Sequence, residues 1–136
     1  MTATTPQADA VMAFSVAVRS ASVDAHRSAQ GSTFVRELLG GGLPVAGYAK
    51  LAVQHYFIYS SLEAAAVAMA TVPEAAPFVR NELKRVPALE SDLAFLLGDD
   101  WRSVITPTPA TVAYRNRIDE VCGSWAGGFV AHHYVR

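Results

Sequence analysis

The chain has 136 residues, enough for one domain with a hydrophobic core. With 51% hydrophobic and 17% charged residues, the composition is that of a globular protein and excludes a disordered chain. A formal net charge of −1 gives no overall attraction to nucleic acid or to an anionic membrane. The Ala-rich run Ala64–Val72 is too short to span a bilayer.

Residues 1–11 are polar and carry no signal sequence, so we expect a disordered tail there. A single cysteine favours a reducing compartment, and we therefore expect a cytoplasmic protein. Helical periods of apolar residues fill the rest of the chain, whereas strand signals are scarce. The sequence thus predicts one all-α domain over residues 1–136.

The stretch Phe14–Phe34 is predicted to be helical with two distinct faces. Its apolar stripe consists of Phe14, Val18, Ala21 and Ala25. The opposite face consists of Arg19, Val23, His26 and Gln30. On that face a cation, an imidazole and an amide stack along one line, within reach of one bound object.

Glycine and proline residues separate this stretch from the helices that follow. The expected helices cover residues 45–71, 78–97 and 109–122, and a last one starts at Trp125. We expect a bend at Pro87, a C-cap at Gly98, an N-cap at Thr108 and a large anchor residue at Trp101. Because the last helix stops at Arg136 on an unfinished apolar face, we expect that the chain is cut there.

His26 is the strongest candidate metal ligand. A neutral imidazole binds iron through one nitrogen while the other donates to an acceptor, and the Gln30 carbonyl is placed to accept. The alternative is a packed histidine that donates to a backbone carbonyl. Other arrangements are weaker, because His132 and His133 are adjacent and diverge on a helix. Cys122 is expected to be a buried structural thiol.

Several separated segments resemble the signatures of the haem oxygenase family, biliverdin-producing and of bacterial type. They are residues 24–30 around His26, Tyr56–Glu63, Leu89–Trp101, Thr108–Tyr114 and Val130–Arg136. They occur in the family's order and spacing and cover about residues 12–136. The resemblance implies a helical bundle in which His26 is the proximal ligand of haem iron.

The resemblance also implies roles for other residues and the reaction itself. Arg19 and Tyr134 would contact the haem propionates, and Tyr59, Tyr114 and Arg136 would belong to the distal hydrogen-bond network. Haem would be both substrate and cofactor, cleaved to biliverdin, CO and ferrous iron. The reaction would use O₂ and electrons from an external reductase or ferredoxin.

The chain departs from the family pattern in two places. Gln30 stands where the family usually has glutamate, so a neutral amide would hold the imidazole without adding charge. The family's distal Gly-Asp-x-Ser-Gly-Gly stretch and later helices are absent from this sequence. Three hypotheses remain: a haem oxygenase, a non-catalytic haem-binding module, and a helical bundle of the same fold that binds no haem.

Overall fold

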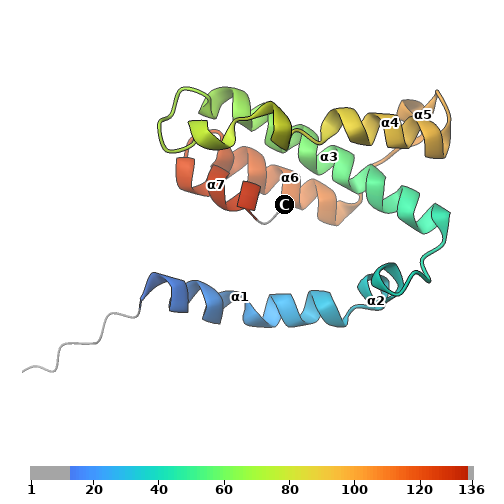
Figure 1. Ribbon diagram of the computed structural model, residues 1–136, viewed down its shortest axis with the longest axis horizontal. Coiled ribbons are helices and arrows are strands. Elements are labelled where there is room, and N and C mark those ends of the chain that lie inside the picture. The colour runs from blue at the N-terminus through green and yellow to red at the C-terminus, as the bar shows by residue number, and fades with distance from the viewer. Residues whose placement is uncertain (1–12, 135–136) are drawn as a thin grey trace, which may run out of the picture. The chain divides into compact units, whose positions relative to one another are not determined.

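The structure is a computed structural model that describes residues 13–134. Within this range every regular element is helical, which confirms the predicted all-α class (Figure 1). The α-helices are α1 (Phe14–Gly31), α2 (Thr33–Leu39), α3 (Val45–Met69), α4 (Val86–Leu97), α5 (Trp101–Val104), α6 (Pro109–Cys122) and α7 (Ala126–Tyr134). Two 3₁₀ turns, Ala76–Phe78 and Asn81–Leu83, precede α4. None of the described helices is long and apolar enough to cross a membrane.

The chain divides into two compact units, Met1–Leu43 and Pro44–Arg136. In the first unit, α1 and α2 contact each other. The stretch predicted as one helix to Phe34 is split at Ser32, whose backbone is extended at φ −66° and ψ 143°. The Ser32 hydroxyl accepts a hydrogen bond from the Val35 amide at 3.2 Å, so the residue that interrupts α1 also caps α2.

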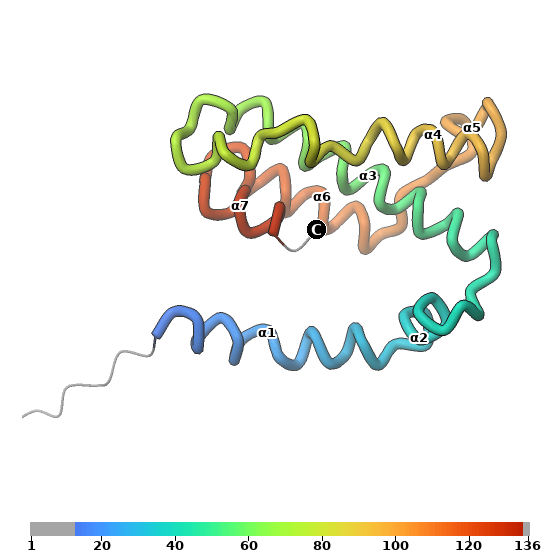
Figure 2. Tube along the Cα trace, in the orientation of Figure 1, coloured from blue at the N-terminus to red at the C-terminus, as the bar shows by residue number. Residues whose placement is uncertain are grey.

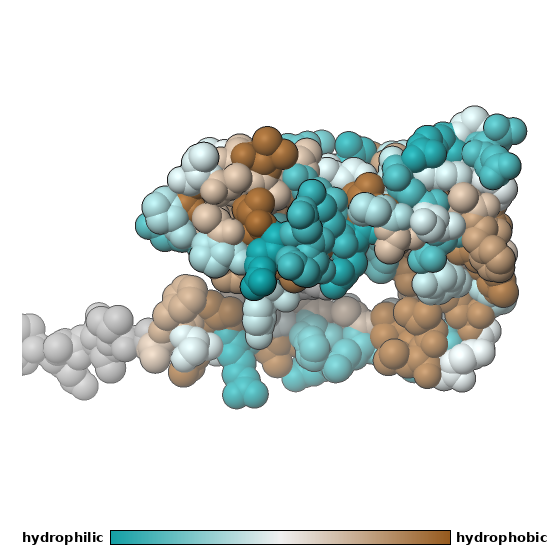
Figure 3. Space-filling view, turned by 45° about the horizontal axis from the view of Figure 1, so that its top comes forward, coloured by the Kyte–Doolittle hydropathy of each residue, from teal (hydrophilic) through white to brown (hydrophobic). Residues whose placement is uncertain are grey.

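The predicted apolar stripe of α1 finds no cover within the first unit. Helix α1 has no buried residue, and the Phe14 side chain is 84% exposed. Brown apolar side chains accordingly appear on the surface of the first unit beside teal polar ones (Figure 3). The two helices of this unit have too little apolar surface to cover the apolar stripe of α1.

In the second unit, the long helix α3 contacts α4, α6 and α7 (Figure 2). One core cluster joins α3 to α6 and α7, and its buried members are Ile58, Leu62, Met69, Ala75, Ile118, Cys122 and Phe129. Leu62 is 1% exposed, and Ile118, Cys122 and Phe129 are fully buried. Burial of this apolar area is the main source of stability for these three helices.

A second core cluster joins α3 to α4 and α5 through Ala52, Val53, Leu93 and Trp101. Trp101 is 2% exposed, which confirms it as the anchor of the turn. The Tyr56 ring meets the Trp101 ring edge to face, with centroids 4.9 Å apart. The Arg102 guanidinium lies 4.3 Å from the centroid of the Trp101 ring and forms a 2.7 Å ion pair with Glu90.

The predicted helix ends are confirmed at Gly98 and Thr108. Gly98 has φ 86°, a conformation that favours glycine, and it ends α4. The Thr108 hydroxyl accepts from the Thr111 amide at 3.3 Å, with Pro109 in the first turn of α6.

The prediction of a continuous helix bent at Pro87 is wrong. Pro87 lies in the first turn of α4, where the missing N–H has no helical partner to lose. The two 3₁₀ turns occupy the part of the predicted helix that precedes it.

Glu63 of α3 caps α4 from outside that helix. Its Oε1 accepts hydrogen bonds from the backbone amides of Arg85 at 2.7 Å and Val86 at 2.9 Å. The N-cap residue of α4, Arg85, makes no side-chain cap hydrogen bond of its own. The carboxylate thus satisfies two otherwise unpaired donors and places a negative charge at a helix N-terminus.

We expect Glu63→Ala to lower the free energy of unfolding by about 1–2 kcal/mol, because two amides at the start of α4 lose their acceptor. Glu63→Gln should lose less, since an amide oxygen still accepts. The matched control is Glu82→Ala, which removes an exposed 3.7 Å ion pair with Arg80 and should cost less than about 0.5 kcal/mol. Urea denaturation checks these values, and equal losses for Glu63→Ala and Glu82→Ala would contradict the capping role.

Candidate functional site

The histidine face of α1 is open. Arg19, His26 and Gln30 are exposed side chains on one side of a regular helix, with His26 about two turns after Arg19 and one turn before Gln30. Small residues border the imidazole, namely Ala25, Ala29 and Gly31. A Cβ added at Gly31 would meet no other atom within 4 Å. The first unit therefore offers an imidazole on a surface that a flat ligand can approach closely.

The available side chains suit a metal whose other ligands come from a cofactor. Among residues 13–134, no three His, Cys, Asp or Glu side chains converge to hold a bare metal ion. A single imidazole is instead the axial ligand that a protein commonly gives to haem iron, whose other ligands come from the porphyrin. His26 and the small residues beside it fit that group.

In the second unit, two of the predicted site tyrosines share one hollow. Tyr59 of α3 and Tyr134 of α7 line a cavity of about 380 Å³. Its other lining residues are Phe78, Leu83, Arg85 and His133. The Tyr134 side chain is 88% exposed, so its hydroxyl is available to a ligand. The hollow combines aromatic walls with one guanidinium.

The third predicted tyrosine, Tyr114, is paired with a histidine of α7. The Tyr114 hydroxyl lies 2.7 Å from Nδ1 of His132, and the two ring centroids are 5.3 Å apart. Tyr114 also packs against the core formed by α3, α6 and α7. Arg136, the remaining residue predicted for the distal network, lies outside the described residues.

His133 lines a small hollow with Glu63 and Ala66 of α3, whereas His132 contacts Tyr114 of α6, in agreement with the expectation that adjacent histidines diverge. Its ring packs on Phe129 with centroids 4.3 Å apart. Its Nε2 is buried and has no hydrogen-bond partner within the described structure. Burial lowers the pKa of His133 because the charged form is poorly solvated, and the negative charge of Glu63 partly opposes this effect.

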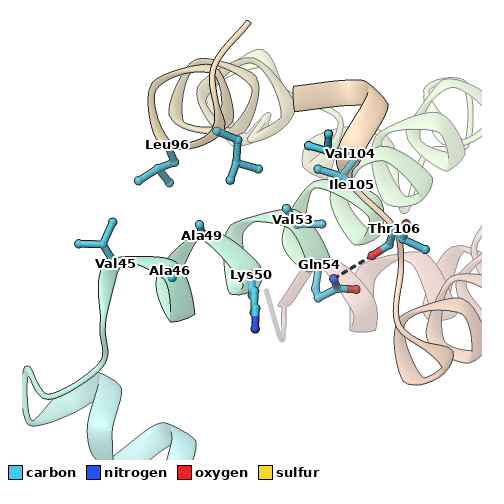
Figure 4. A pocket seen from close by; sticks show the side chains of 11 residues that line it. Val45, Ala46, Ala49, Lys50, Val53, Gln54, Leu96, Val104, Ile105 and Thr106 are labelled. Atoms are coloured by element: carbon cyan, nitrogen blue, oxygen red, sulfur yellow. Dashed lines mark hydrogen bonds between the residues drawn. The ribbon is translucent and has the colours of Figure 1, made fainter. Parts of the chain in front are cut away.

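Another hollow, of about 590 Å³, lies between α3, α4 and the residues before α6 (Figure 4). Its walls are mostly aliphatic, with Lys50 and Gln54 at the polar edge. Gln54 is held in place, because its amide donates to the Thr106 carbonyl at 3.3 Å and accepts from the Thr108 amide at 2.9 Å. None of the predicted site residues lines this hollow.

Cys122 is fully buried in the core, as predicted for a structural thiol. Burial is the main cause of its raised pKa, and the negative charge of Asp119 adds to the effect. The thiolate is therefore disfavoured, which makes this cysteine a poor nucleophile.

Three polar contacts were not predicted from the sequence: the Glu63 cap, the Tyr114–His132 pair and a contact of Arg115. The Arg115 guanidinium donates through Nε to the hydroxyl of buried Ser61 at 2.9 Å. One signal was available for Arg115, because it follows Thr111 and precedes Ile118 on the buried stripe of α6. The other two join elements far apart in sequence and leave no local pattern.

Comparison with known proteins places this chain in a family. Residues 12–136 match the family described as "Heme oxygenase". The heme oxygenase of Rhodella violacea is 34% identical over 119 residues, covering 88% of this chain and 51% of that protein. Human heme oxygenase 1 is 35% identical over 133 residues, covering 96% of this chain and 46% of that protein.

Among solved structures, the fold is similar to heme oxygenase-1 from the cyanobacterium Synechocystis sp. PCC6803 in complex with heme. The TM-score is 0.78 at 30% sequence identity, over 89% of this chain and 55% of that one. The chain belongs to the haem oxygenase family. It spans about half the length of the curated relatives it matches.

The lowered pKa of His133 predicts a specific loss of stability in mild acid. The folded state binds this proton less readily than the unfolded state, so stability is full above the unfolded pKa and falls as the pH drops below about 6.5. We expect the unfolding free energy to decrease less between pH 7.5 and 5.5 in His133→Leu than in the unsubstituted protein. Denaturation at the two pH values measures this, and parallel decreases would contradict the assignment.

Proposed function

We propose that this chain is the haem-binding part of a haem oxygenase, with His26 as the proximal iron ligand. The observation that carries the proposal is the open face of α1, where an imidazole stands among small residues in a chain of this family. The neighbour of similar fold was solved in complex with heme, which supports the choice of ligand.

In this proposal α1 provides the proximal ligand of haem. His26 binds the iron, and the side-chain carbonyl of Gln30, one turn further along α1, accepts the proton of its second nitrogen. Arg19 provides a charge-assisted hydrogen bond to a propionate. The amide of Gln30 orients the ring without adding charge, so His26 is a weaker electron donor than a histidine backed by a carboxylate.

Other residues have the roles that the family resemblance implies. Tyr134 contacts a propionate, and Tyr59, Tyr114 and Arg136 belong to the hydrogen-bond network. When bound, haem supplies both the iron at which O₂ is activated and the carbon framework that is cleaved. The products are biliverdin, CO and ferrous iron. The electrons come from a separate reductase or ferredoxin, and we expect the reaction to take place in the cytoplasm.

A non-catalytic haem-binding module is the second candidate. One observation favours it: Gln30, one turn from His26, is a neutral amide that adds no charge to the imidazole and so weakens its donation to iron. Haem binding through His26 needs the residues of α1 named above. Turnover also depends on the distal hydrogen-bond network.

We expect the unsubstituted protein to shift the Soret band of haem on titration and His26→Ala to lose this shift, because the iron loses its axial ligand. His55→Ala, which removes a histidine of α3, is the matched control and should titrate like the unsubstituted protein. Absorption spectra and far-UV circular dichroism of all three proteins make the test. The same Soret shift in His26→Ala would contradict ligation by His26.

Aerobic turnover separates the two candidates. With ascorbate or a reductase and ferredoxin, an oxygenase converts the haem spectrum to that of biliverdin, whereas a binding module retains the haem spectrum. If the haem spectrum is retained, catalysis by this chain is contradicted. The haem titration then still decides whether His26 binds haem.

Gln30→Glu should lower the reduction potential of bound haem, because a carboxylate makes the imidazole more electron-rich. Gln30→Ala serves as the control. It removes the acceptor altogether and should weaken haem binding by about tenfold. Spectroelectrochemistry measures the potential, and an unchanged value in Gln30→Glu would show that residue 30 does not face the imidazole.

A further inference from the structure

The aliphatic hollow of about 590 Å³ in the second unit takes no part in the proposed function. Its walls come from the first half of α3, the end of α4, α5 and the residues between α5 and α6. Figure 4 shows Ala49 and Val53 of α3 directed toward Leu96 of α4 and toward Ile105. All of these residues belong to one unit, so the hollow does not depend on how the two units are placed.

The walls of the hollow are held in place by other contacts. Val53 is 7% exposed and belongs to the core cluster of α3, α4 and α5, and Ile105 packs against that cluster. Gln54 ties the segment before α6 to α3, because its amide donates to the Thr106 carbonyl at 3.3 Å and accepts from the Thr108 amide at 2.9 Å. A ligand that enters a preformed site loses less free energy to ordering the protein.

The size of the hollow indicates what kind of occupant it fits. Small-molecule sites typically have volumes of about 300–1,000 Å³, and the volume of this hollow lies within that range. A stable protein interface uses about 20–30 residues on each side, whereas 11 residues line the hollow. Its rim residues Val45 and Val104 are 71% and 67% exposed, so aliphatic surface is left for an occupant to cover. These observations favour a small ligand with an aliphatic body.

The charge at the edge of the hollow indicates the head group of that ligand. Of the described residues that line the hollow, Lys50 alone is charged. Within residues 13–134 it forms no ion pair with a carboxylate. Figure 4 shows its side chain at the edge, directed away from Leu96. A lysine stem lies along apolar surface while its ammonium group stays in water, so a negative head group beside Nζ is favoured.

We propose that this hollow binds a small aliphatic carboxylate, with its hydrocarbon chain against Ala49 and Leu96 and its carboxylate beside Lys50. The proposal does not rest on the proposed function, because no residue assigned to haem lines the hollow. It gives the second unit a ligand site of its own, and the site can be tested in the protein without haem.

The length of the hydrocarbon chain tests the aliphatic walls. Butanoate, hexanoate and octanoate are titrated into the protein below their micellar concentrations. We expect the affinity to rise about fourfold for each CH₂ group that becomes buried. Nuclear Overhauser effects should join the octanoate chain to the methyl groups of Leu96 and Ile105. An affinity that is independent of chain length, or contacts confined to other residues, would overturn the proposal.

Ligands with the same chain and different head groups test the role of Lys50. Octanoate should bind about two- to fivefold more tightly than octanol, the magnitude of an exposed ion pair, and octylamine should bind more weakly than octanol. The formal net charge of the chain is −1, so its overall charge does not favour an anion.

Lys50→Met keeps most of the apolar stem and should remove the advantage of octanoate over octanol. Lys84→Met, which changes a lysine outside the hollow, is the matched control and should retain it. Equal affinities for octanoate and octylamine in the unsubstituted protein, or an advantage of octanoate that survives in Lys50→Met, would contradict the proposed head-group site.

A substitution in the rim tests the hollow as a whole. Val104→Asp should weaken octanoate binding about tenfold, because an aliphatic wall is lost. Val67→Asp changes another exposed valine, on α3 and outside the hollow, and should bind octanoate like the unsubstituted protein. Far-UV circular dichroism checks that both variants fold. Unchanged octanoate binding in Val104→Asp would refute the site. A dimer in sedimentation that Val104→Asp alone dissociates would also refute it, because a second copy would then cover the hollow.

Discussion

The packing of α3 on three other helices is the constraint on which the second unit depends. Its buried residues lie on two sides of the helix, with Val53 in the cluster of α4 and α5 and Leu62 in the cluster of α6 and α7. A helix that is apolar around most of its circumference is stable only when neighbours cover it. Tyr59 follows directly after buried Ile58, so the same packing that stabilises the unit holds this tyrosine at its hollow.

The fold was predictable from the sequence where the signal is local. Gly98, Thr108 and Trp101 have the predicted roles, because capping and turn formation depend on a few neighbouring residues. The helix boundary at Pro87 was not predictable from period alone, since the apolar pattern continues through residues that form 3₁₀ turns. The break at Ser32 has the same origin: a serine is tolerated within helices, and only the observed backbone shows that it caps α2.

The candidate site was likewise predictable only where the signal is local. The face of Arg19, His26 and Gln30 follows from helical spacing, and the structure shows it exposed on α1. The partner of Tyr114 did not follow, because a hydrogen bond between residues 18 positions apart depends on how α6 packs against α7. The family was recognisable from motifs in order along the chain, and the comparisons confirm it. The roles of individual residues rest on that resemblance and stay predictions.

The carboxylate of Glu63 serves more than one element at once. One oxygen accepts from two amides of α4, and the same charge opposes the effect of burial on His133 of α7. Groups that share a partner do not contribute independently to stability. We therefore expect epistasis at this position. The cost of changing residue 63 will depend on which residue stands at 133.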